Sequence, residues 1–185
     1  METNTKPAGL DLDNSSEIFV EDGEPVLLFN GQQFPWGEFP IEILAQILHE
    51  LNHDMKARKG LALLGIEDPD DRLRFYTFCR FGDFDKVPDV DPDGSVKGEY
   101  WDCGHRPCKA DGLLCHLPQV PNGSLTPHDA AIIRLVSQDL PNKTIADCMG
   151  VHVETMNRQV KNIAHKISCF TKSGIAAFAG RKNII

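Results

Sequence analysis

The sequence predicts a mainly α-helical protein in which a helical C-terminal domain follows a mixed α/β, cysteine-rich N-terminal domain. Apolar residues recur every three or four positions in segments 40–58, 70–80 and 125–167, which is the spacing of helices that bury one face. Two short apolar runs in 18–30 are separated by Glu-Asp-Gly-Glu-Pro, which is typical of a hairpin or two edge strands. The helical segments outweigh this short β region, so we expect a mostly helical fold.

Composition divides the 185 residues into two domains. Residues 1–16 are polar and have little to bury, so we expect a disordered arm there. The segment 118–124 holds two prolines, a glycine and no charge, which indicates a linker. These limits define an acidic, cysteine-containing N-terminal domain at 17–117 and a helical domain at 125–185.

Two helices are expected in the N-terminal domain after the hairpin. The first follows Pro40, a favourable first-turn residue, and extends to about Arg58 before Gly60 interrupts it. The second is expected over 70–80, after the break at Asp68 and Pro69.

The segment 81–117 has eight acidic residues and few apolar ones, so it needs a stabilising element other than a hydrophobic core. It holds three of the six cysteines, at Cys103, Cys108 and Cys115, and Cys79 precedes it. In a reducing compartment, grouped cysteines bind metal more often than they form disulfides. Four thiolates complete a tetrahedral zinc site, so we expect zinc at Cys79, Cys103, Cys108 and Cys115. An iron–sulfur cluster on the same ligands and unliganded, redox-active cysteines are the alternatives.

Charge is divided unevenly along the chain. Residues 121–185 hold eight lysines and arginines against four acids, a net of +4, whereas residues 1–120 hold 11 against 23, a net of −12. The basic part suits a polyanion, and the acidic part is expected to face solvent or a protein. No apolar stretch approaches the length of a membrane span and the N-terminus lacks a signal-peptide pattern, so we expect a cytoplasmic protein without membrane contact.

The C-terminal segment has the pattern of a helix-turn-helix. Thr126 and Pro127 are expected to begin one helix, and Asn142 to cap a short second helix that ends before Gly150. A third helix is expected over 153–167, with apolar residues spaced by three or four at Val153, Met156, Val160, Ile163 and Ile167. Two short helices joined by a glycine-containing turn allow the second of them to enter a major groove.

The same segment resembles the LuxR-type (GerE-like) helix-turn-helix domain of bacterial transcription regulators. The resemblance covers the last third of the chain without a gap and rests on Leu125, Thr126, Pro127, Leu135, Leu140, Asn142, Lys143, Ile145, Ala146, Thr155, Ile163, Lys166 and Ile167. It implies a four-helix domain in which 173–180 forms the last helix, a frequent dimer surface in the family, so a homodimer is expected.

Position by position, the resemblance also implies the residues that contact DNA. They are Asn157, Arg158 and Lys161 toward the groove, Asn142, Lys143 and Thr155 near the phosphates, and Lys166 as a further basic contact. Two positions depart from the family pattern: Met156 stands where valine is usual and Gln159 where histidine is usual. The first change is conservative, whereas the second is expected to alter backbone contacts or specificity.

We therefore expect a non-enzymatic, sequence-specific regulator that binds duplex DNA and uses its N-terminal domain to sense a signal or bind a partner. The alternative is an interaction factor that binds RNA polymerase or another regulator and for which DNA contact is secondary. Salt-dependent duplex binding distinguishes these two functions.

Two short motifs suggest other chemistry but lack essential parts. The spacing of Asp89, Asp91 and Asp93 opens an EF-hand loop, yet Tyr100 occupies the place of the closing glutamate. The segment 49–53 spells His-Glu-x-x-His, a zinc-protease motif, without a third ligand at the usual spacing. We expect neither calcium nor protease activity from these motifs.

Overall fold

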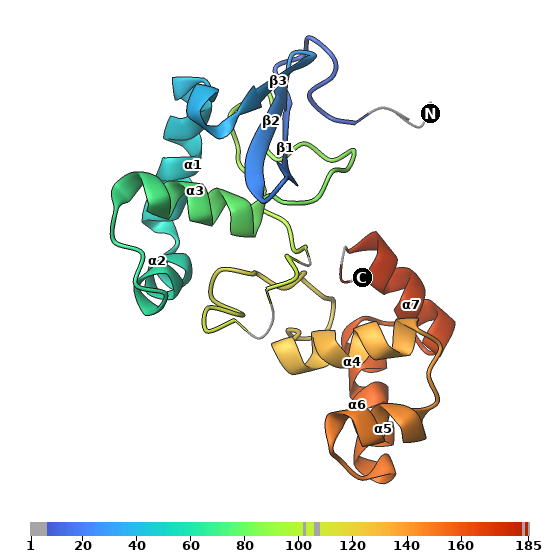
Figure 1. Ribbon diagram of the computed structural model, residues 1–185. Helices are drawn as coiled ribbons and strands as arrows, with labels where there is room; N and C mark the ends of the chain where they lie inside the picture. Colours follow the sequence, from blue (N-terminus) through green and yellow to red (C-terminus); the bar gives the residue numbers. More distant parts are fainter. Residues whose placement is uncertain (1–6, 102, 106–107, 183, 185) are drawn as a thin grey trace. The chain divides into compact units, whose positions relative to one another are not determined.

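The computed structural model describes residues 7–101, 103–105, 108–182 and 184, which are mostly helical with one small antiparallel sheet (Figure 1). The chain forms two compact units, Met1–His116 and Leu117–Ile185. The first contains β1 (Ser16–Glu21), β2 (Glu24–Phe29), β3 (Gln32–Pro35), the short 3-10 helix η1 (Trp36–Glu38), α1 (Ile41–His53), α2 (Met55–Leu63) and α3 (Pro69–Arg80). The second contains α4 (Pro127–Ser137), α5 (Asn142–Met149), α6 (Val153–Lys166) and α7 (Lys172–Arg181). The structure therefore confirms the expected fold class at the level of a mixed α/β fold that is mostly helical.

Tight two-residue turns fix the order β1-β2-β3 of the sheet. Asp22 and Gly23 join β1 to β2 with φ angles of 51° and 82°, and Asn30 and Gly31 join β2 to β3 with 49° and 75°. Paired positive φ values match the right-handed twist of the flanking strands. The expected hairpin is therefore present, and the third strand, which the sequence analysis missed, follows an Asn-Gly pair typical of such turns.

The expected disorder of 1–16 is wrong for its described part. Ala8 and Gly9 are buried, and the Gly9 carbonyl accepts a 2.8 Å hydrogen bond from the Gly31 amide. A Cβ at Gly9 would lie 2.1 Å from the Leu28 carbonyl oxygen, so only glycine permits this approach to the sheet. Residues 1–6 lie outside the described residues.

The single helix expected over 40–58 is in fact two helices. The chain breaks at Asp54, whose carboxylate accepts a 2.9 Å hydrogen bond from the Ala57 amide and so begins α2. Gly60 does not interrupt the helix but lies inside α2, where an added Cβ would lie 3.0 to 3.3 Å from Leu114, Leu113 and Ala110. Close packing against the later loop therefore explains this glycine.

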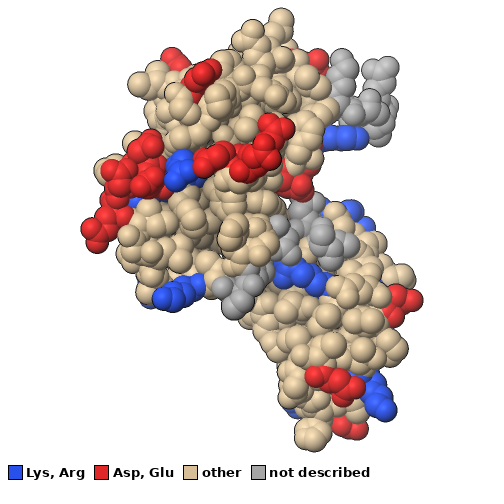
Figure 2. All heavy atoms as spheres, viewed as in Figure 1, with Lys and Arg blue, Asp and Glu red and all other residues tan. Residues whose placement is uncertain are grey.

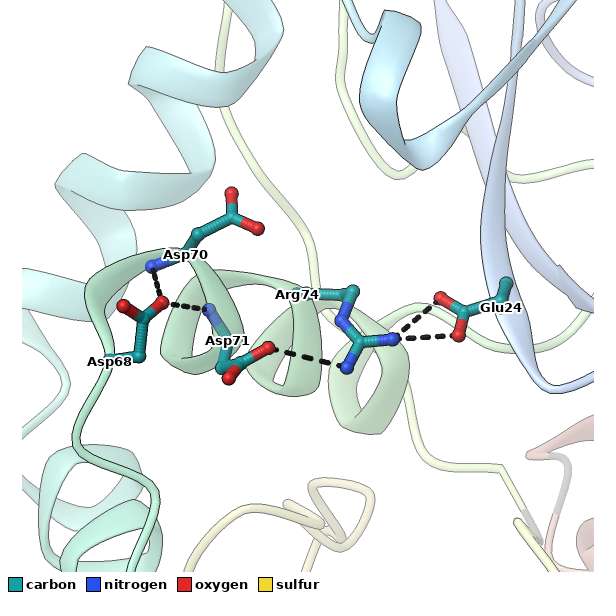
Figure 3. Close-up of polar contacts among 5 residues, drawn as sticks. All are labelled: Glu24, Asp68, Asp70, Asp71 and Arg74. Carbon is teal, nitrogen blue, oxygen red and sulfur yellow. Dashed lines mark hydrogen bonds and ion pairs between the residues drawn. The ribbon is translucent and has the colours of Figure 1, made fainter.

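Helix α3 begins where the break at Asp68 predicts and is tied to the sheet. One Asp68 carboxylate oxygen accepts hydrogen bonds from the amides of Asp70 and Asp71, at 2.9 and 3.1 Å. Farther along the helix, the Arg74 guanidinium donates to both carboxylate oxygens of Glu24 on β2 (Figure 3). The exposed position of this pair limits its contribution to stability to about 0–1 kcal/mol.

The segment 81–116 takes part in the core, contrary to the expectation that it lacks core-forming residues. Val90, Ala110 and Leu114 are buried in one cluster with Ile18, Leu27 and residues of α1 to α3. The Ser16 amide donates to the Val90 carbonyl at 2.9 Å, and the Asp89 amide donates to the Ser16 carbonyl at 3.0 Å. The segment is therefore fixed to the edge strand β1.

The second unit is a helical bundle that begins with a capping box. The Thr126 hydroxyl accepts from the Asp129 amide and the Asp129 carboxylate accepts from the Thr126 amide, at 3.1 and 2.9 Å. Helix α4 packs against α5, α6 and α7. Asn142 is the first residue of α5 and not its cap, which is Pro141. Among the described residues, none of the helices is both long and apolar enough to span a membrane.

Candidate functional site

A short turn joins α5 to α6, the segment predicted to form a helix-turn-helix. Gly150 ends α5 with a φ of 65°, and the Val151 amide then donates to the Ala146 carbonyl at 3.0 Å. This left-handed residue is the usual glycine termination of a helix. Only Val151 and His152 follow before α6 begins at Val153.

The two sides of α6 differ sharply in polarity. Met156, Val160 and Ile163 are buried and anchor the helix to the rest of the unit. Asn157, Arg158 and Lys161, the three residues predicted to enter the groove, are exposed. The helix is 14 residues long, so it offers a rigid polar surface of about 21 Å.

The residues predicted to lie near phosphates take different positions. Lys143 is exposed, whereas Asn142 and Thr155 are half-buried. The Asn142 side-chain amide donates a 2.7 Å hydrogen bond to Oδ1 of Asn157, which connects the start of α5 to the exposed side of α6. This bond restricts the rotamers of two residues predicted to contact DNA.

Lys166 and Gln159 have internal partners. Lys166 Nζ lies 2.8 Å from the Asp129 carboxylate, and neither side chain is more than about a quarter exposed. Gln159 Nε2 lies 3.0 Å from His128 Nε2 at the start of α4. Both contacts join α6 to α4, so these residues orient the third helix of the unit.

The four cysteines predicted to bind metal line one cavity of about 620 Å³ in the first unit. Cys79 comes from the last turn of α3, and Cys103, Cys108 and Cys115 come from the following segment. Cys79 and Cys115 are buried, whereas Cys103 and Cys108 are half-buried. His105, Phe75 and Phe78 line the same cavity.

The thiols in this cavity interact with one another. Cys79 is hydrogen-bonded to Cys115, and this bond, burial and the nearby Cys103 and Cys108 raise the pKa of Cys79 well above its ordinary value. The Ala110 amide donates to Cys108 Sγ at 3.4 Å, which holds this sulfur at the wall of the cavity. Among the described residues, no three of these four sulfurs lie within 4.8 Å of one another. The structure therefore brings the donor set of a soft metal site to one cavity without drawing the sulfurs into a closed ligand group.

Other cysteines and motifs lie elsewhere. Cys148 and Cys169 belong to the second unit and do not line this cavity. His49 and His53 are exposed on α1, with their ring centroids 4.3 Å apart, the ring planes tilted by 44° and His53 Nδ1 2.7 Å from the His49 carbonyl oxygen. This backbone contact engages one ring nitrogen, so the geometry offers no support for a protease site.

The acidic segment does not form the EF-hand considered above. Asp89 is buried and accepts a 2.8 Å hydrogen bond from the Ile18 amide, Asp91 pairs with Lys97, and Asp93 accepts from the Ser95 amide at 2.9 Å. A different acidic group converges instead: ligand oxygens of Asp83, Asp85 and Glu99 lie within 4.8 Å of one another. The sequence analysis missed it because its members are separated in the chain and follow no motif.

No protein-family model matches the chain, and no curated protein matches its sequence significantly. The functional assignment therefore depends on the chemistry of these sites.

Proposed function

We propose that this protein is a sequence-specific transcription regulator that binds duplex DNA through a LuxR-type domain, with α6 as its recognition helix. The observation that carries the proposal is the polarity of α6. Arg158 and Lys161 are exposed on a helix whose other side is anchored by buried Met156, Val160 and Ile163. A major groove admits one helix of this kind, and such a helix must keep its orientation while its polar side chains reach base edges and phosphates.

The distribution of charge supports the same function. Residues 121–185 carry a net charge of +4 within a chain of net charge −8. On the face drawn in Figure 2, Asp and Glu form a dense band over the first unit. A basic second unit is attracted to DNA, and an acidic first unit avoids it.

Each exposed residue of α6 has a chemistry suited to one part of DNA. The Arg158 guanidinium can donate two hydrogen bonds to a guanine edge, and the Asn157 carboxamide can pair with an adenine edge. Lys161 and Lys143 supply ammonium groups for phosphates, which position the protein without reading sequence.

A homodimer accompanies this proposal. Ser173, Ala177 and Gly180 are small and exposed on one side of α7, and small residues permit close approach of a second helix. Dimeric helix-turn-helix proteins bind two half-sites about one helical turn of DNA apart.

In the first unit, we propose that Cys79, Cys103, Cys108 and Cys115 hold one zinc ion that stabilises the segment after α3. Four thiolates are a complete structural zinc set, and all four line one cavity. The unit would then act as the sensory or partner-binding part of the regulator.

The DNA proposal is tested with duplexes selected by the full-length protein from a random pool. The affinity of the best duplex is measured by fluorescence anisotropy over a series of salt concentrations. Replacing Arg158 with alanine should cost about 1–3 kcal/mol and relax specificity at one base pair. Replacing Lys143 should weaken all duplexes alike and reduce the salt slope by about 0.9 for each phosphate that is no longer neutralised.

A matched control removes the same charge elsewhere. Lys56 and Lys59 are exposed on α2 in the first unit, and their replacement by alanine should leave affinity and salt slope unchanged. If Arg158→Ala/Lys161→Ala binds the selected duplex as tightly as the unchanged protein, the proposal is wrong. RNA polymerase binding that survives this double substitution would then favour the interaction-factor alternative.

A further inference from the structure

Three carboxylates meet beside the end of α3 in the first unit. The ligand oxygens of Asp83, Asp85 and Glu99 lie within 4.8 Å of one another, and all three side chains are half-buried. Glu99 Oε1 accepts hydrogen bonds from the Gly82 and Asp83 amides at 3.1 and 2.6 Å. The segment 82–85 is thereby fixed around the Glu99 carboxylate.

A fourth carboxylate, Glu17 on β1, is buried next to this group. Its side chain is only 1% exposed, and Oε1 accepts a 2.7 Å hydrogen bond from the Asp85 amide. Oε2 is also buried but has no hydrogen-bond partner. A buried carboxylate oxygen without a donor costs free energy, because it has lost its water without replacement.

These four carboxylates have no ion-pair partner within residues 7–101, 103–105, 108–182 and 184. No lysine, arginine or histidine there forms an ion pair with Glu17, Asp83, Asp85 or Glu99. The nearby Arg80 guanidinium donates to the Glu99 backbone carbonyl at 3.5 Å. The group instead acts on Glu17 by like-charge repulsion from Asp83, Asp85 and Glu99. Other acids of the same segment do have partners: Asp91 pairs with Lys97, and Asp93 accepts from Ser95.

From this arrangement we propose that Asp83, Asp85 and Glu99 bind one hard divalent cation of the Ca²⁺ or Mg²⁺ class, next to the buried and unpartnered Oε2 of Glu17 on β1. Carboxylate oxygens are the ligands that these ions prefer, and water completes their coordination. The cation neutralises carboxylates that form no ion pair with any described side chain, and it ties the segment after α3 to Glu99. This site is separate from the sulfur ligands of the cysteine cavity, which suit a softer ion.

Trp101 provides a spectroscopic probe for this site. Its indole packs on Gly82, where an added Cβ would lie 1.8 Å from Cε2, and its Nε1 donates to the Phe78 carbonyl at 2.9 Å. Gly82 immediately precedes Asp83, so a luminescent lanthanide bound at the site lies close to an excitable tryptophan. Terbium has the oxygen preference of Ca²⁺ and can be displaced by it.

The experiment uses the full chain after removal of metals and return of one equivalent of zinc, so that the cysteine cavity is in the same state throughout. Terbium is titrated with excitation of tryptophan, and Ca²⁺ and Mg²⁺ are then added as competitors. We expect saturable emission that Trp101→Phe abolishes and Trp36→Phe retains. We also expect Ca²⁺ or Mg²⁺ to displace terbium and to raise the Tm.

Two double variants with equal charge change distinguish the site from general acidity. Asp83→Asn/Asp85→Asn should weaken binding at least about tenfold, whereas Asp91→Asn/Asp93→Asn should change it little. Circular dichroism in the absence of the cation confirms that both variants are folded. Glu17→Gln, which keeps the shape of the side chain, should weaken binding without unfolding the protein.

Three outcomes would overturn the proposal. The first is no saturable emission and no rise in Tm at millimolar Ca²⁺ or Mg²⁺. The second is equal weakening in the two double variants, which would indicate diffuse attraction to acidic residues. The third is undiminished binding in a folded Asp83→Asn/Asp85→Asn variant.

Discussion

Lys166 Nζ lies 2.8 Å from Oδ2 of Asp129, which joins the last turn of α6 to the first turn of α4. The same carboxylate oxygen accepts from the Thr126 amide and hydroxyl, each at 2.9 Å. One oxygen therefore caps α4 and holds α6. This contact gives Lys166, which the sequence analysis assigned to DNA, an internal structural partner.

Replacing Lys166 with methionine should destabilise the second unit by about 1–2 kcal/mol, because a partly buried charged hydrogen bond is lost. The effect should diminish in acid. Burial raises the pKa of Asp129, but hydrogen bonds from Lys166 and Thr126 outweigh it and lower the pKa below 3.8. The contribution is therefore present above about pH 4 and is lost as pH falls through the folded-state pKa.

Urea unfolding followed by circular dichroism at several pH values measures this effect. The unchanged protein should lose stability as the pH falls below 4, and Lys166→Met should show a smaller loss. The salt slope of DNA binding should stay the same in both proteins. A variant of unchanged stability and reduced salt slope would instead assign Lys166 to a phosphate.

Glu17 makes the first unit less stable in alkali. Burial and the neighbouring carboxyls of Asp85, Glu99 and Asp83 raise the pKa of Glu17 to about 8, from 4.5. A raised folded-state pKa means that the folded protein binds the proton more tightly, so stability is full below about pH 4.5 and falls as pH rises toward 8. One pKa unit corresponds to about 1.4 kcal/mol, so the loss is on the order of a few kcal/mol.

Glu17→Gln should therefore remove most of this decline in protein free of divalent cations other than zinc. The measurement is the free energy of unfolding in urea at roughly pH 5 and pH 9. A smaller decline should persist, because burial and nearby acids also raise the pKa of Glu99 to about 7. If stability falls equally in Glu17→Gln and in the unchanged protein between these pH values, the pKa of Glu17 is not raised in the folded protein.

Local signals in the sequence were sufficient for α4, α5 and α6, whereas α7 was expected only from the family resemblance. The capping residue Thr126, the turn residue Gly150 and the apolar spacing of α6 act within a few positions of one another, so they predict helices that the structure contains. The exposure of Arg158 follows from the same spacing. Such features do not depend on distant parts of the chain.

Long-range packing explains what sequence could not predict in the first unit. Gly60 looked like a helix breaker because its neighbours Leu113 and Leu114 are distant in the chain. Glu17 and Glu99 carry no common motif, and only the fold brings them together. The four cysteines that line one cavity could be predicted to lie together, because residue type alone marks such candidates whatever their separation in the chain.

The packing of Gly60 predicts a substitution effect opposite to helix propensity. Alanine favours helix over glycine by about 1 kcal/mol, yet a Cβ here would lie 3.0 Å from Cγ of Leu114, which is fully buried. We expect Gly60→Ala to destabilise the first unit by about 1–3 kcal/mol through overpacking. In α7, Gly180 has nothing within 4 Å of an added Cβ, so Gly180→Ala should be neutral or stabilising for the monomer, measured at dilutions where the proposed dimer face of α7 is unoccupied. Thermal unfolding of both variants tests this contrast, and a stabilised Gly60→Ala would contradict the close packing.

The cysteine cavity predicts one metal ion per chain that stabilises the first unit. Cys79 and Cys115 are buried with Cys103 and Cys108 nearby, so removing the metal would remove the ion that links the end of α3 to the following segment. Elemental analysis of the full-length protein should find one zinc, and a chelator should lower the Tm. An iron–sulfur cluster would instead give visible absorption and iron.

Serine substitutions identify the ligands of this metal. Cys103→Ser should reduce the zinc content and lower the Tm, because a hydroxyl is a poor replacement for a thiolate on zinc. Cys148, which is exposed in the second unit, provides the control: Cys148→Ser should keep full zinc and the same Tm. If Cys103→Ser keeps its zinc and a variant without His49 loses it, the metal site is the His-Glu-x-x-His segment and not the cysteine cavity. Protein that contains no metal after expression with excess zinc and iron, and is equally stable with chelator, would show that these cysteines are unliganded.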